Sequence, residues 1–234
     1  MNDSQDKIVA IVPAAGIGSR MGAEIPKQYL QIGERPILGL TLEILLSHPG
    51  ISEVIVALHP EDSFFNSLSQ SSHPKLRAVI GGAERADSVL ACLNHLSDDC
   101  WALVHDAARP CLTHGDIDKL IASRECFPQG AILAAPVRDT MKRGNADGTV
   151  KETVCREQLW HALTPQLFPA KELQVNLEQA LTIGANITDE ASAMEWAGVA
   201  PGLVIGRADN IKITHPDDLV LAGLFLGSTA NLGR

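Results

Sequence analysis

Short runs of β-branched and aliphatic residues alternate along the chain with longer stretches whose apolar residues recur at helical spacing. The strand-like runs cover residues 8–12, 53–58, 77–80, 101–104 and 131–135, and the helical stretches cover 37–47, 88–96 and 116–123. Such alternation requires crossover connections, which place the strands parallel in one sheet. Hydrophobic residues make up 45% of the chain and aromatic residues only 4%, which suits buried parallel strands. We predict an α/β fold with a mostly parallel sheet flanked by helices.

The pattern changes after residue 136. Two strand-like segments, 140–143 and 149–154, flank the turn-rich sequence Asn145-Ala146-Asp147-Gly148. Strands on either side of such a turn predict a β-hairpin. We expect this hairpin to project from the sheet as an arm at about 138–160.

The rest of the chain returns to the earlier alternation. It predicts helices at about 169–183 and 188–197, a strand near 203–206 and a last helix from Pro216. Neither a linker nor an internal repeat interrupts the sequence. We therefore expect a single domain over residues 1–234, with the arm as its one projection.

The arm suggests an assembly, because an isolated hairpin is only marginally stable in water. Leu159, Trp160 and Leu163 follow the arm and offer further apolar surface. We predict that the arm packs on a second copy of the chain in a homodimer. A surface flap without a partner is the alternative.

Charge and cysteine usage narrow the class of protein. The formal net charge of −9 argues against a general nucleic-acid binder, although a few cations can still form a local site for an anionic ligand. Cys92, Cys100, Cys111, Cys126 and Cys155 form no C-x-x-C pair, which fits a reducing cytoplasm better than a disulfide framework. Neither a signal peptide nor a membrane span of roughly 20 apolar residues is evident. We expect a cytoplasmic protein that binds neither nucleic acid nor membrane.

The segment after the first predicted strand is the most informative. It runs Val12-Pro13-Ala14-Ala15-Gly16-Ile17-Gly18-Ser19-Arg20-Met21-Gly22 and is followed by Pro26-Lys27-Gln28. Small residues let backbone N–H groups approach phosphate oxygens, and Arg20 and Lys27 add positive charge. The spacing fits neither the dinucleotide fingerprint nor the Walker pattern. It predicts a phosphate-binding loop of another kind, with a plain strand-exit turn as the alternative.

A carboxylate follows the fourth predicted strand, in Val104-His105-Asp106-Ala107-Ala108-Arg109-Pro110. At the carboxyl edge of a sheet, Asp106 is well placed to hold a divalent cation. Capping of a helix N-terminus is an equally good interpretation from spacing alone. A lone histidine is more often structural, so we assign His105 no catalytic role.

Two further segments follow strands. In residues 81–88, paired glycines leave room for a flat base and Ser88 could bond to sugar or base, while a turn that caps the next helix is the alternative. In residues 206–214, Asp209 could be a second metal ligand and Lys212 a phosphate contact, and a solvated loop is the alternative. Zinc-type spacing, a G-x-S-x-G elbow and a covalent nucleophile are not found in the sequence.

Taken together, these segments resemble the 2-C-methyl-D-erythritol 4-phosphate cytidylyltransferase family of the non-mevalonate isoprenoid pathway. In chain order the matching pieces are PAAGIGSRMG with PKQY, GGAERADSV, VHDAARP, APVRDTMKR, LWHALTPQ, ITDEASAMEW and GRADNIKIT, from residue 13 to residue 214. The phosphate loop is shared with many sugar-nucleotide transferases. The combination of VHDAARP, ALTPQ and DNIKIT is much more specific.

The resemblance implies a Rossmann-like nucleotidyltransferase fold, a homodimer with exchanged β-arms and dependence on a divalent cation, usually Mg²⁺. The implied reaction joins CMP from CTP to methylerythritol phosphate and releases pyrophosphate. Arg20 and Lys27 would be the catalytic cations, and Asp106 and Asp209 would meet the metal. The residues implied for the nucleotide are Pro13, Ala14, Ala15, Gly16, Gly82, Ala83, Ser88, Asp106 and Ala107. Those implied for the methylerythritol phosphate are Arg109, Thr140, Arg156, Thr164 and Lys212, some of them reaching across from the partner's arm.

Position 83 departs from the family pattern, in which an acidic residue is common. Ala83 offers no polar side chain, so recognition of cytosine there would rest on backbone groups. Among other functions, a related transferase with a ribitol phosphate or acidic sugar acceptor, or with GTP as donor, is the first alternative. A nucleotide-binding regulatory module is disfavoured because both carboxylates and both loop cations are present. The glycine spacing disfavours an NAD-dependent dehydrogenase.

Overall fold

One seven-stranded sheet organises the chain, in the order β11-β7-β10-β6-β1-β4-β5. The structure is a computed structural model that describes residues 7–16 and 25–232, with side chains described as far as residue 227. The strands of the sheet are β1 (Ile8–Pro13), β4 (Glu53–Leu58), β5 (Leu76–Ile80), β6 (Trp101–Val104), β7 (Ala131–Pro136), β10 (Trp160–Pro169) and β11 (Gly202–Ile205). Two small hairpins lie outside it, β2 (Gln31–Ile32) with β3 (Arg35–Pro36) and β8 (Met141–Gly144) with β9 (Val150–Val154).

The strand directions confirm the predicted fold class. β1 runs parallel to β4 and β6, β4 runs parallel to β5, and β11 runs parallel to β7. β10 alone is antiparallel, between β6 and β7. Because β1 and β6 pair in parallel register, with Ile11 opposite Val104, the loops that leave their carboxyl ends emerge side by side. Ligands of open α/β sheets bind at such edges.

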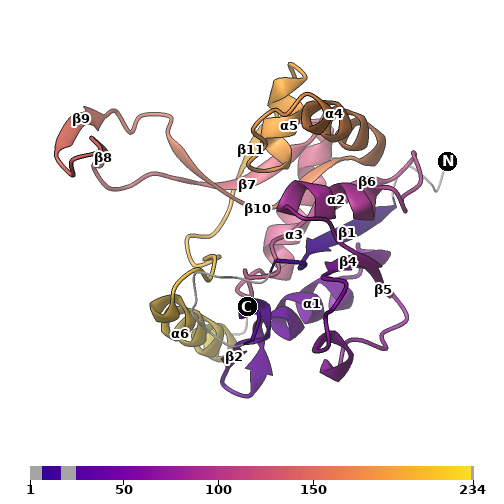
Figure 1. Cartoon of the computed structure of the whole chain (residues 1–234). Helices are drawn as coiled ribbons and strands as arrows, with labels where there is room; N and C mark the ends of the chain where they lie inside the picture. Colours follow the sequence, from indigo (N-terminus) through magenta and orange to yellow (C-terminus); the bar gives the residue numbers. More distant parts are fainter. Residues whose placement is uncertain (1–6, 17–24, 233–234) are drawn as a thin grey trace.

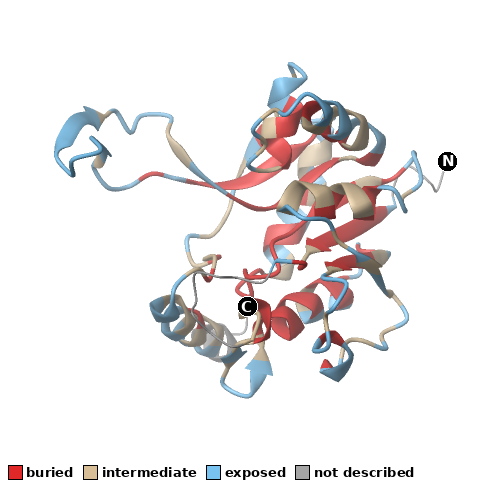
Figure 2. Cartoon of the chain, in the orientation of Figure 1, coloured by how far each residue is buried: buried red, intermediate tan, exposed pale blue. Residues whose placement is uncertain are grey.

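β1 illustrates why the strands read as continuous apolar runs. Ile8, Ala10 and Val12 pack in one hydrophobic cluster, and Val9 and Ile11 pack in another, each residue being at most 2% exposed. Alternate side chains of a strand point to opposite faces of the sheet, so β1 is buried on both faces. Figure 2 shows this buried layer running through the sheet.

Helices cover both faces of the sheet. α1 (Ile37–Ser47) and α3 (His114–Ala122) pack on the cluster that contains Ala10, and α2 (Arg85–Leu93), α4 (Ala170–Thr182) and α5 (Glu190–Trp196) pack on the cluster that contains Ile11. α6 (Pro216–Leu232) lies apart, where Ala222 packs with Ile37, Ala108 and Ile213 (Figure 1). The 3₁₀ turns are η2 (Lys27–Tyr29), η3 (Phe65–Ser67) and η4 (Ser123–Glu125).

The predicted arm is present as the antiparallel pair β8 and β9, with Met141 opposite Val154. Figure 1 shows it extending away from the rest of the chain. The backbone N–H of Val137 donates to the oxygen of Leu159 over 2.9 Å and closes the base of the arm. Most of the arm is exposed, and Val150 retains 62% of its accessible surface.

One expectation about the arm is wrong. Leu163 is not part of an apolar surface beside it, because Leu163 is only 9% exposed and packs in the cluster beneath α1 and α3. Trp160 likewise packs against the cluster on the opposite face. Both residues belong to β10, a strand that the sequence pattern did not predict, and β10 enters the sheet immediately after the arm.

The cysteines fall into two groups. Cys92, Cys100 and Cys111 are buried, whereas Cys126 and Cys155 are exposed, and all five are free thiols. Burial raises the pKa of Cys92 to about 12 and that of Cys111 to about 11. Within residues 7–16 and 25–232, every helix is too short or too polar to span a membrane.

Candidate active site

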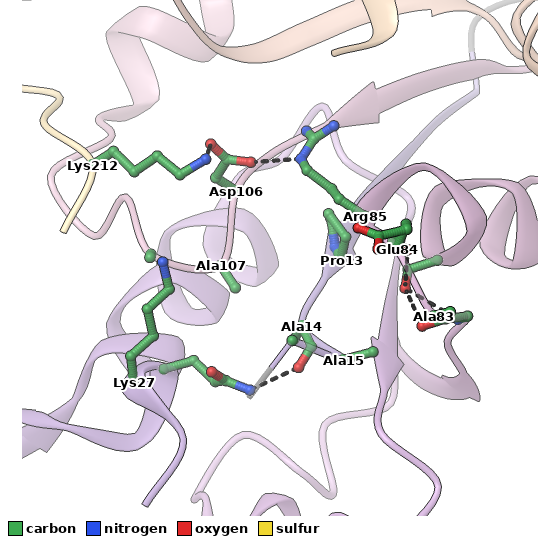
Figure 3. Close-up of a pocket in the computed structure, with 15 residues that line it drawn as sticks. Pro13, Ala14, Ala15, Lys27, Ala83, Glu84, Arg85, Asp106, Ala107 and Lys212 are labelled. Atoms are coloured by element: carbon green, nitrogen blue, oxygen red, sulfur yellow. Dashed lines mark hydrogen bonds and ion pairs between the residues drawn. The ribbon is translucent and has the colours of Figure 1, made fainter. Parts of the chain in front are cut away.

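A cavity opens at the carboxyl edge of the sheet, between the loops that follow β1, β5 and β6 (Figure 3). All of the residues predicted to bind the nucleotide line this nucleotide cavity, together with Lys27 and Lys212. The lining residues are Pro13, Ala14, Ala15, Gly16, Lys27, Gln28, Gly82, Ala83, Glu84, Arg85, Ser88, Asp106, Ala107, Ala108 and Lys212. Segments far apart in the sequence therefore meet in one place.

The loop after β1 is anchored at Ala14. The backbone N–H of Ala14 donates to Ala57 of β4 over 2.8 Å, and the oxygen of Ala14 accepts a hydrogen bond of 2.7 Å from the side chain of Gln28. Gln28 is in η2, beside Lys27, whose Nζ donates to the oxygen of Ile213 over 3.4 Å. The turn that carries Lys27 is thus fixed against the glycine loop. Arg20 lies outside the described residues.

The loop after β5 is held close to the glycine loop. A Cβ added at Gly81 would stand 2.6 Å from the Cβ of Ala15, so a larger residue at position 81 would displace the loop. Ser88 is 2% exposed, and its hydroxyl accepts from the N–H of Gly82 over 3.1 Å. Glu84 is the N-cap of α2 in a reciprocal capping box with Asp87. The alternative of a turn that caps the next helix is therefore present at Glu84, and binding of the base or sugar by this segment stays a prediction.

Three cationic side chains of the site pair with Asp106. It leaves β6 in a turn, and the helix that follows is capped by Thr113, so Asp106 is not a helix cap. Its Oδ1 lies 3.0 Å from Nε of Arg85, and its Oδ2 lies 2.9 Å from Nζ of Lys212 and 3.3 Å from Nε of Arg109. Burial alone would raise the pKa of Asp106, but Arg85, Lys212 and Arg109 together hold it well below its usual range.

A second cavity adjoins the first at Asp106. It shares Arg85, Asp106 and Lys212 with the nucleotide cavity and adds Arg109, Ala162, Leu163, Thr164, Gln166, Thr188 and Asp189. Arg109, Thr164 and Lys212, three of the residues predicted for the acceptor, therefore lie together. Thr140 and Arg156 do not lie with them, because both are exposed residues of the arm within one chain.

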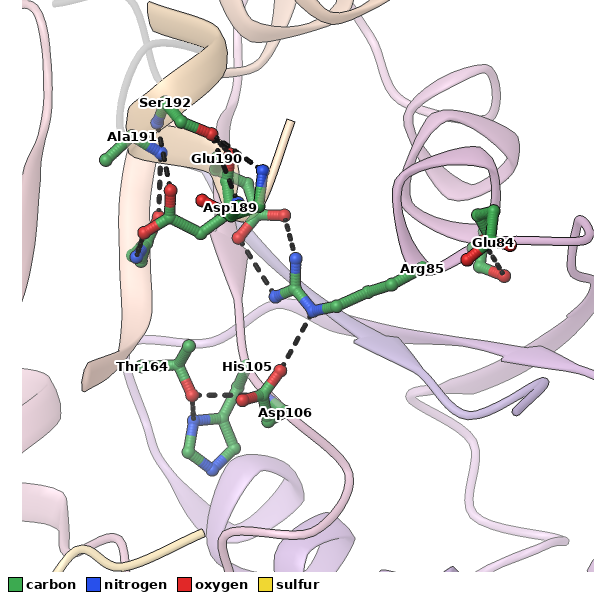
Figure 4. A network of polar contacts seen from close by, with 12 residues as sticks. Glu84, Arg85, His105, Asp106, Thr164, Asp189, Glu190, Ala191 and Ser192 are labelled. Atoms are coloured by element: carbon green, nitrogen blue, oxygen red, sulfur yellow. Dashed lines mark hydrogen bonds and ion pairs between the residues drawn. The ribbon is translucent and has the colours of Figure 1, made fainter. Parts of the chain in front are cut away.

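His105 supports the site from behind and is fully buried. Its Nε2 lies 3.0 Å from the backbone oxygen of Arg109, so Nε2 carries the proton and Nδ1 accepts from the Thr164 hydroxyl over 3.0 Å. The same hydroxyl accepts the N–H of Asp106 over 3.1 Å (Figure 4). Burial lowers the pKa of His105 to about 4. His105 is therefore a neutral structural residue, in line with the sequence-based interpretation.

The segment after β11 is packed and is not a solvated loop. Asn210 is fully buried, its Nδ2 donates to the oxygen of Thr164 over 2.7 Å, and its own backbone oxygen accepts from Nη1 of Arg109 over 2.7 Å. Asp209 lines neither cavity. Its Oδ2 pairs with Arg207, and its Oδ1 is buried without a hydrogen-bond partner among the described residues.

Among the residues of the site that were not predicted, Gln28, Arg85, Gln166 and Glu190 hold its parts together. Arg85 bridges Asp106 and the buried Glu190 (Figure 4). Gln166 accepts a hydrogen bond from the N–H of Ala191 and so holds the start of α5. All four lie within the matched sequence segments, but none stands in a local pattern that assigns it a role. A buried ion pair between residues 85 and 190 leaves no local sequence pattern.

A cavity lined by glycines and two lysines lies at the carboxyl edge of a mostly parallel sheet, beside a second cavity that holds Arg85, Arg109 and Lys212, and this arrangement defines a nucleotide-binding α/β transferase. A family model described as IspD, 2-C-methyl-D-erythritol 4-phosphate cytidylyltransferase, matches residues 8–228. The chain belongs to this family of enzymes.

Relatives and solved structures agree with this assignment. A protein of Shewanella sediminis named 2-C-methyl-D-erythritol 4-phosphate cytidylyltransferase is 82% identical over the whole of both chains. The crystal structure of a 4-diphosphocytidyl-2C-methyl-D-erythritol synthase matches with a TM-score of 0.82 and 38% identity, over 94% of this chain and 98% of that one. The enzyme of the same family from Francisella tularensis matches with a TM-score of 0.82 and 34% identity, over 94% and 99% of the two chains.

Proposed function

We propose that this enzyme transfers CMP from CTP to 2-C-methyl-D-erythritol 4-phosphate and releases pyrophosphate, in the synthesis of isoprenoid precursors. The observation that carries the proposal is the pair of cavities joined at Asp106. One has glycines and alanines along its wall, which let backbone groups approach a nucleotide, and the other holds Arg85, Arg109 and Lys212 beside Asp106 and Asp189, which leaves a net positive charge for an anionic acceptor. The names of the close relatives support the identities of both substrates.

For the nucleotide, we propose that Ala14, Ala15 and Gly16 direct backbone N–H groups to the triphosphate, with Lys27 and Arg20 supplying charge. Pro13, Asp106 and Ala107 would border the ribose, and Gly82, Ala83 and Ser88 the base. The Ser88 hydroxyl already bonds within its own loop, and Ala83 has no polar side chain. Selection of cytosine would therefore rest on the backbone of residues 82 and 83.

For the acceptor, we propose that Arg109, Thr164 and Lys212 form one side of the binding site. Thr140 and Arg156 would come from the arm of a partner subunit, which the arm's exposure favours. On this proposal the enzyme is a homodimer of single-domain chains, residues 1–234, and each active site is complete only with its partner. A cytoplasmic location fits its five free cysteines.

The reaction needs positioning and charge more than proton transfer. A phosphate monoester has a second pKa of about 6, so the acceptor is largely dianionic at neutral pH and its oxygen can attack without a general base. That oxygen forms a bond to the α-phosphorus of CTP while the bond from the α-phosphorus to the β-bridging oxygen breaks, and pyrophosphate leaves. The obstacle is repulsion between two anions. Lys27 and Lys212, together with Arg20, are the cations proposed to offset it.

Magnesium is part of the proposal, but the described residues do not form a cage for it. Both oxygens of Asp106 are paired with cationic side chains, and no cluster of three ligand-type residues occurs among residues 7–16 and 25–232. We propose that Mg²⁺ enters bound to CTP, since Mg²⁺ commonly binds through substrate phosphates and few carboxylates. Contacts of that complex with Asp106 and Asp209 stay a prediction.

A pyrophosphate-release assay tests the proposed function. With CTP, Mg²⁺ and 2-C-methyl-D-erythritol 4-phosphate, we expect release only when all three are present. A panel that replaces CTP by GTP, or the acceptor by ribitol phosphate, tests the alternative transferases. Faster release with either replacement, or binding of CTP without turnover, would overturn the proposal. Sedimentation at micromolar concentration tests the dimer.

A further inference from the structure

Arg85 connects two carboxylates that come from different elements. It is the first residue of α2, and its Nε donates to Oδ1 of Asp106 over 3.0 Å. Its Nη1 and Nη2 donate to the two oxygens of Glu190, over 2.7 and 3.1 Å (Figure 4). The planar guanidinium is thus held by three hydrogen bonds, a geometry that fixes both its position and its orientation.

Glu190 is a buried charge whose place is set by the fold. It is 2% exposed and is the first residue of α5. Gln166 of β10 fixes the start of this helix, because its Oε1 accepts the N–H of Ala191 over 2.9 Å and its Nε2 donates to Asp189 over 2.8 Å. A buried carboxylate is costly without a charged partner, and Arg85 is the partner that this placement provides.

The position of Arg85 matters to both cavities, since Arg85 lines each of them with Asp106 and Lys212. Arg85 also directly follows Glu84, the last residue of the loop that borders the nucleotide cavity. A shift of the guanidinium would move the end of this loop and release one oxygen of Asp106. It would also add an unneutralised positive charge at the boundary between the two cavities.

We propose that Glu190 is a positioning residue for the transfer reaction. Through Arg85 it fixes the positions of the Asp106 carboxylate and of the loop that ends at Glu84, where the two cavities meet. The proposal rests on the proposed function of these cavities. Glu190 touches neither substrate and acts only through Arg85. Its second effect is to neutralise Arg85, so that Lys27, Lys212 and Arg109, with the proposed Arg20, are the cations left to act on the phosphates.

The substitution Glu190→Gln keeps the shape of the side chain and removes its charge. We expect kcat to fall by about 10-fold, because the acceptor and the α-phosphate are held less accurately. We expect the KM for CTP to fall, because Arg85 then adds positive charge near the phosphates. A residue that only stabilised the fold would not produce this split between kcat and KM.

Two comparisons isolate the contact. Glu195→Gln, on an exposed residue of the same helix, is the matched control and should behave as wild type. The double variant Arg85→Gln/Glu190→Gln should have the same kcat as Arg85→Gln alone, because Glu190 acts through Arg85. Glu190→Asp, which keeps the charge, should recover part of the lost kcat. Wild-type kcat in Glu190→Gln, or a further loss of kcat in the double variant, would overturn the proposal.

Titration calorimetry with CTP alone separates this proposal from the proposed function. Glu190→Gln should bind CTP about 3-fold more tightly than wild type at low salt, and high salt should abolish the difference. Unchanged or weaker binding by a variant that unfolds at the wild-type temperature would overturn the positioning role. A wild-type enzyme that binds CTP but releases no pyrophosphate would overturn the proposed function, and the calorimetric comparison would still decide the role of Glu190.

Discussion

The side-chain nitrogen of Gln28 donates a hydrogen bond of 2.7 Å to the backbone oxygen of Ala14. Gln28 is 4% exposed, so both groups are withdrawn from bulk water. The bond joins the turn that carries Lys27 to the loop that begins the nucleotide cavity. This bond explains the spacing between the glycine loop and the PKQY segment, because the chain has to bring Gln28 back to Ala14.

Replacing Gln28 by leucine should weaken CTP binding. A leucine side chain at this position would leave the oxygen of Ala14 unpaired, and an unsatisfied buried acceptor costs about 1–3 kcal/mol. We expect the KM for CTP to rise about 5-fold or more, with the KM for the acceptor nearly unchanged. Steady-state pyrophosphate release measures both constants. Gln31→Leu, on the neighbouring exposed glutamine, is the control, and equal effects in the two variants would contradict this role of Gln28.

Lys27→Ala should lower kcat by roughly 10²-fold, as expected for loss of one preorganised donor at a developing charge. Lys27 lines the nucleotide cavity, and its loss leaves the hydrophobic core intact, so the unfolding temperature should change little. Single-turnover kinetics separate the chemical step from product release. Lys171→Ala, on the exposed face of α4, serves as the control. Near-normal turnover in Lys27→Ala would remove Lys27 from the catalytic role.

Arg156→Ala should mainly raise the KM for the acceptor and leave CTP affinity unchanged, because Arg156 lies on the exposed arm. If Arg156 acts across the subunit boundary, mixing the Lys27→Ala and Arg156→Ala chains should restore activity at an acceptor concentration well below the raised KM, where each variant alone is slow. Random exchange would make about half of the dimers mixed, each with one intact site, so about a quarter of the wild-type sites should return. No recovery after demonstrated subunit exchange would place Arg156 in the site of its own chain.

Gly81→Ala should impair nucleotide binding. The new Cβ would stand 2.6 Å from the Cβ of Ala15 and 2.8 Å from the hydroxyl of Ser88, so one of the two loops has to move. Displacement of a binding loop by a fraction of an ångström typically costs affinity, and we expect the Kd for CTP to rise about 10-fold. Calorimetry measures this value directly. Gly115→Ala on α3, where the nearest atom lies at 4.0 Å, should leave it unchanged.

His105 should make the folded state sensitive to acid. Its pKa is about 4 in the folded protein and 6.5 in the unfolded chain, so below pH 6.5 the unfolded chain takes up a proton that the folded protein does not. This contribution is complete above pH 6.5 and is lost as the pH falls to about 4, which amounts to about 3 kcal/mol.

Urea unfolding at pH 7 and pH 4 measures this effect as a difference between two proteins. Burial also lowers the pKa of His48, so part of the acid sensitivity should persist without His105. His105→Gln should reduce the loss of unfolding free energy between the two pH values. An equal loss in wild type and His105→Gln would contradict the assignment of a buried, neutral imidazole.

The fold followed from the sequence wherever a segment carries a continuous apolar run or apolar residues at helical spacing. The apolar run of β1 and the helical spacing of α1 are local patterns, and both elements appear where they were expected. β10 was missed for a physical reason. Its middle carries Thr164, Pro165 and Gln166 in place of an apolar run, and its pairing with β7 shifts between Ala162 and Gln166. Proline in a strand interior normally argues against a strand.

The site was predictable only in part, for a similar reason. The glycines and cations that follow β1, β5 and β6 mark a sheet edge, and a sheet edge brings such loops together. The contacts of Asp106 depend on three-dimensional packing, because Arg85 lies well before Asp106 in the sequence and Lys212 lies far after it. Arg20 lies outside the described residues, so its role stays a prediction.

The two classes of thiol make the arm accessible to selective chemistry. Thiolates attack alkylating reagents, so Cys92 and Cys111, with pKa values of about 12 and 11, should react slowly, as should Cys100, whose pKa burial also raises. Cys155 is exposed on the arm beside Arg156, and Cys126 is the other exposed thiol. A Cys126→Ser protein would therefore accept a fluorescent label at Cys155 alone. The fluorescence of such a label would report, in real time and for each substrate, whether the arm leaves solvent and packs on another surface.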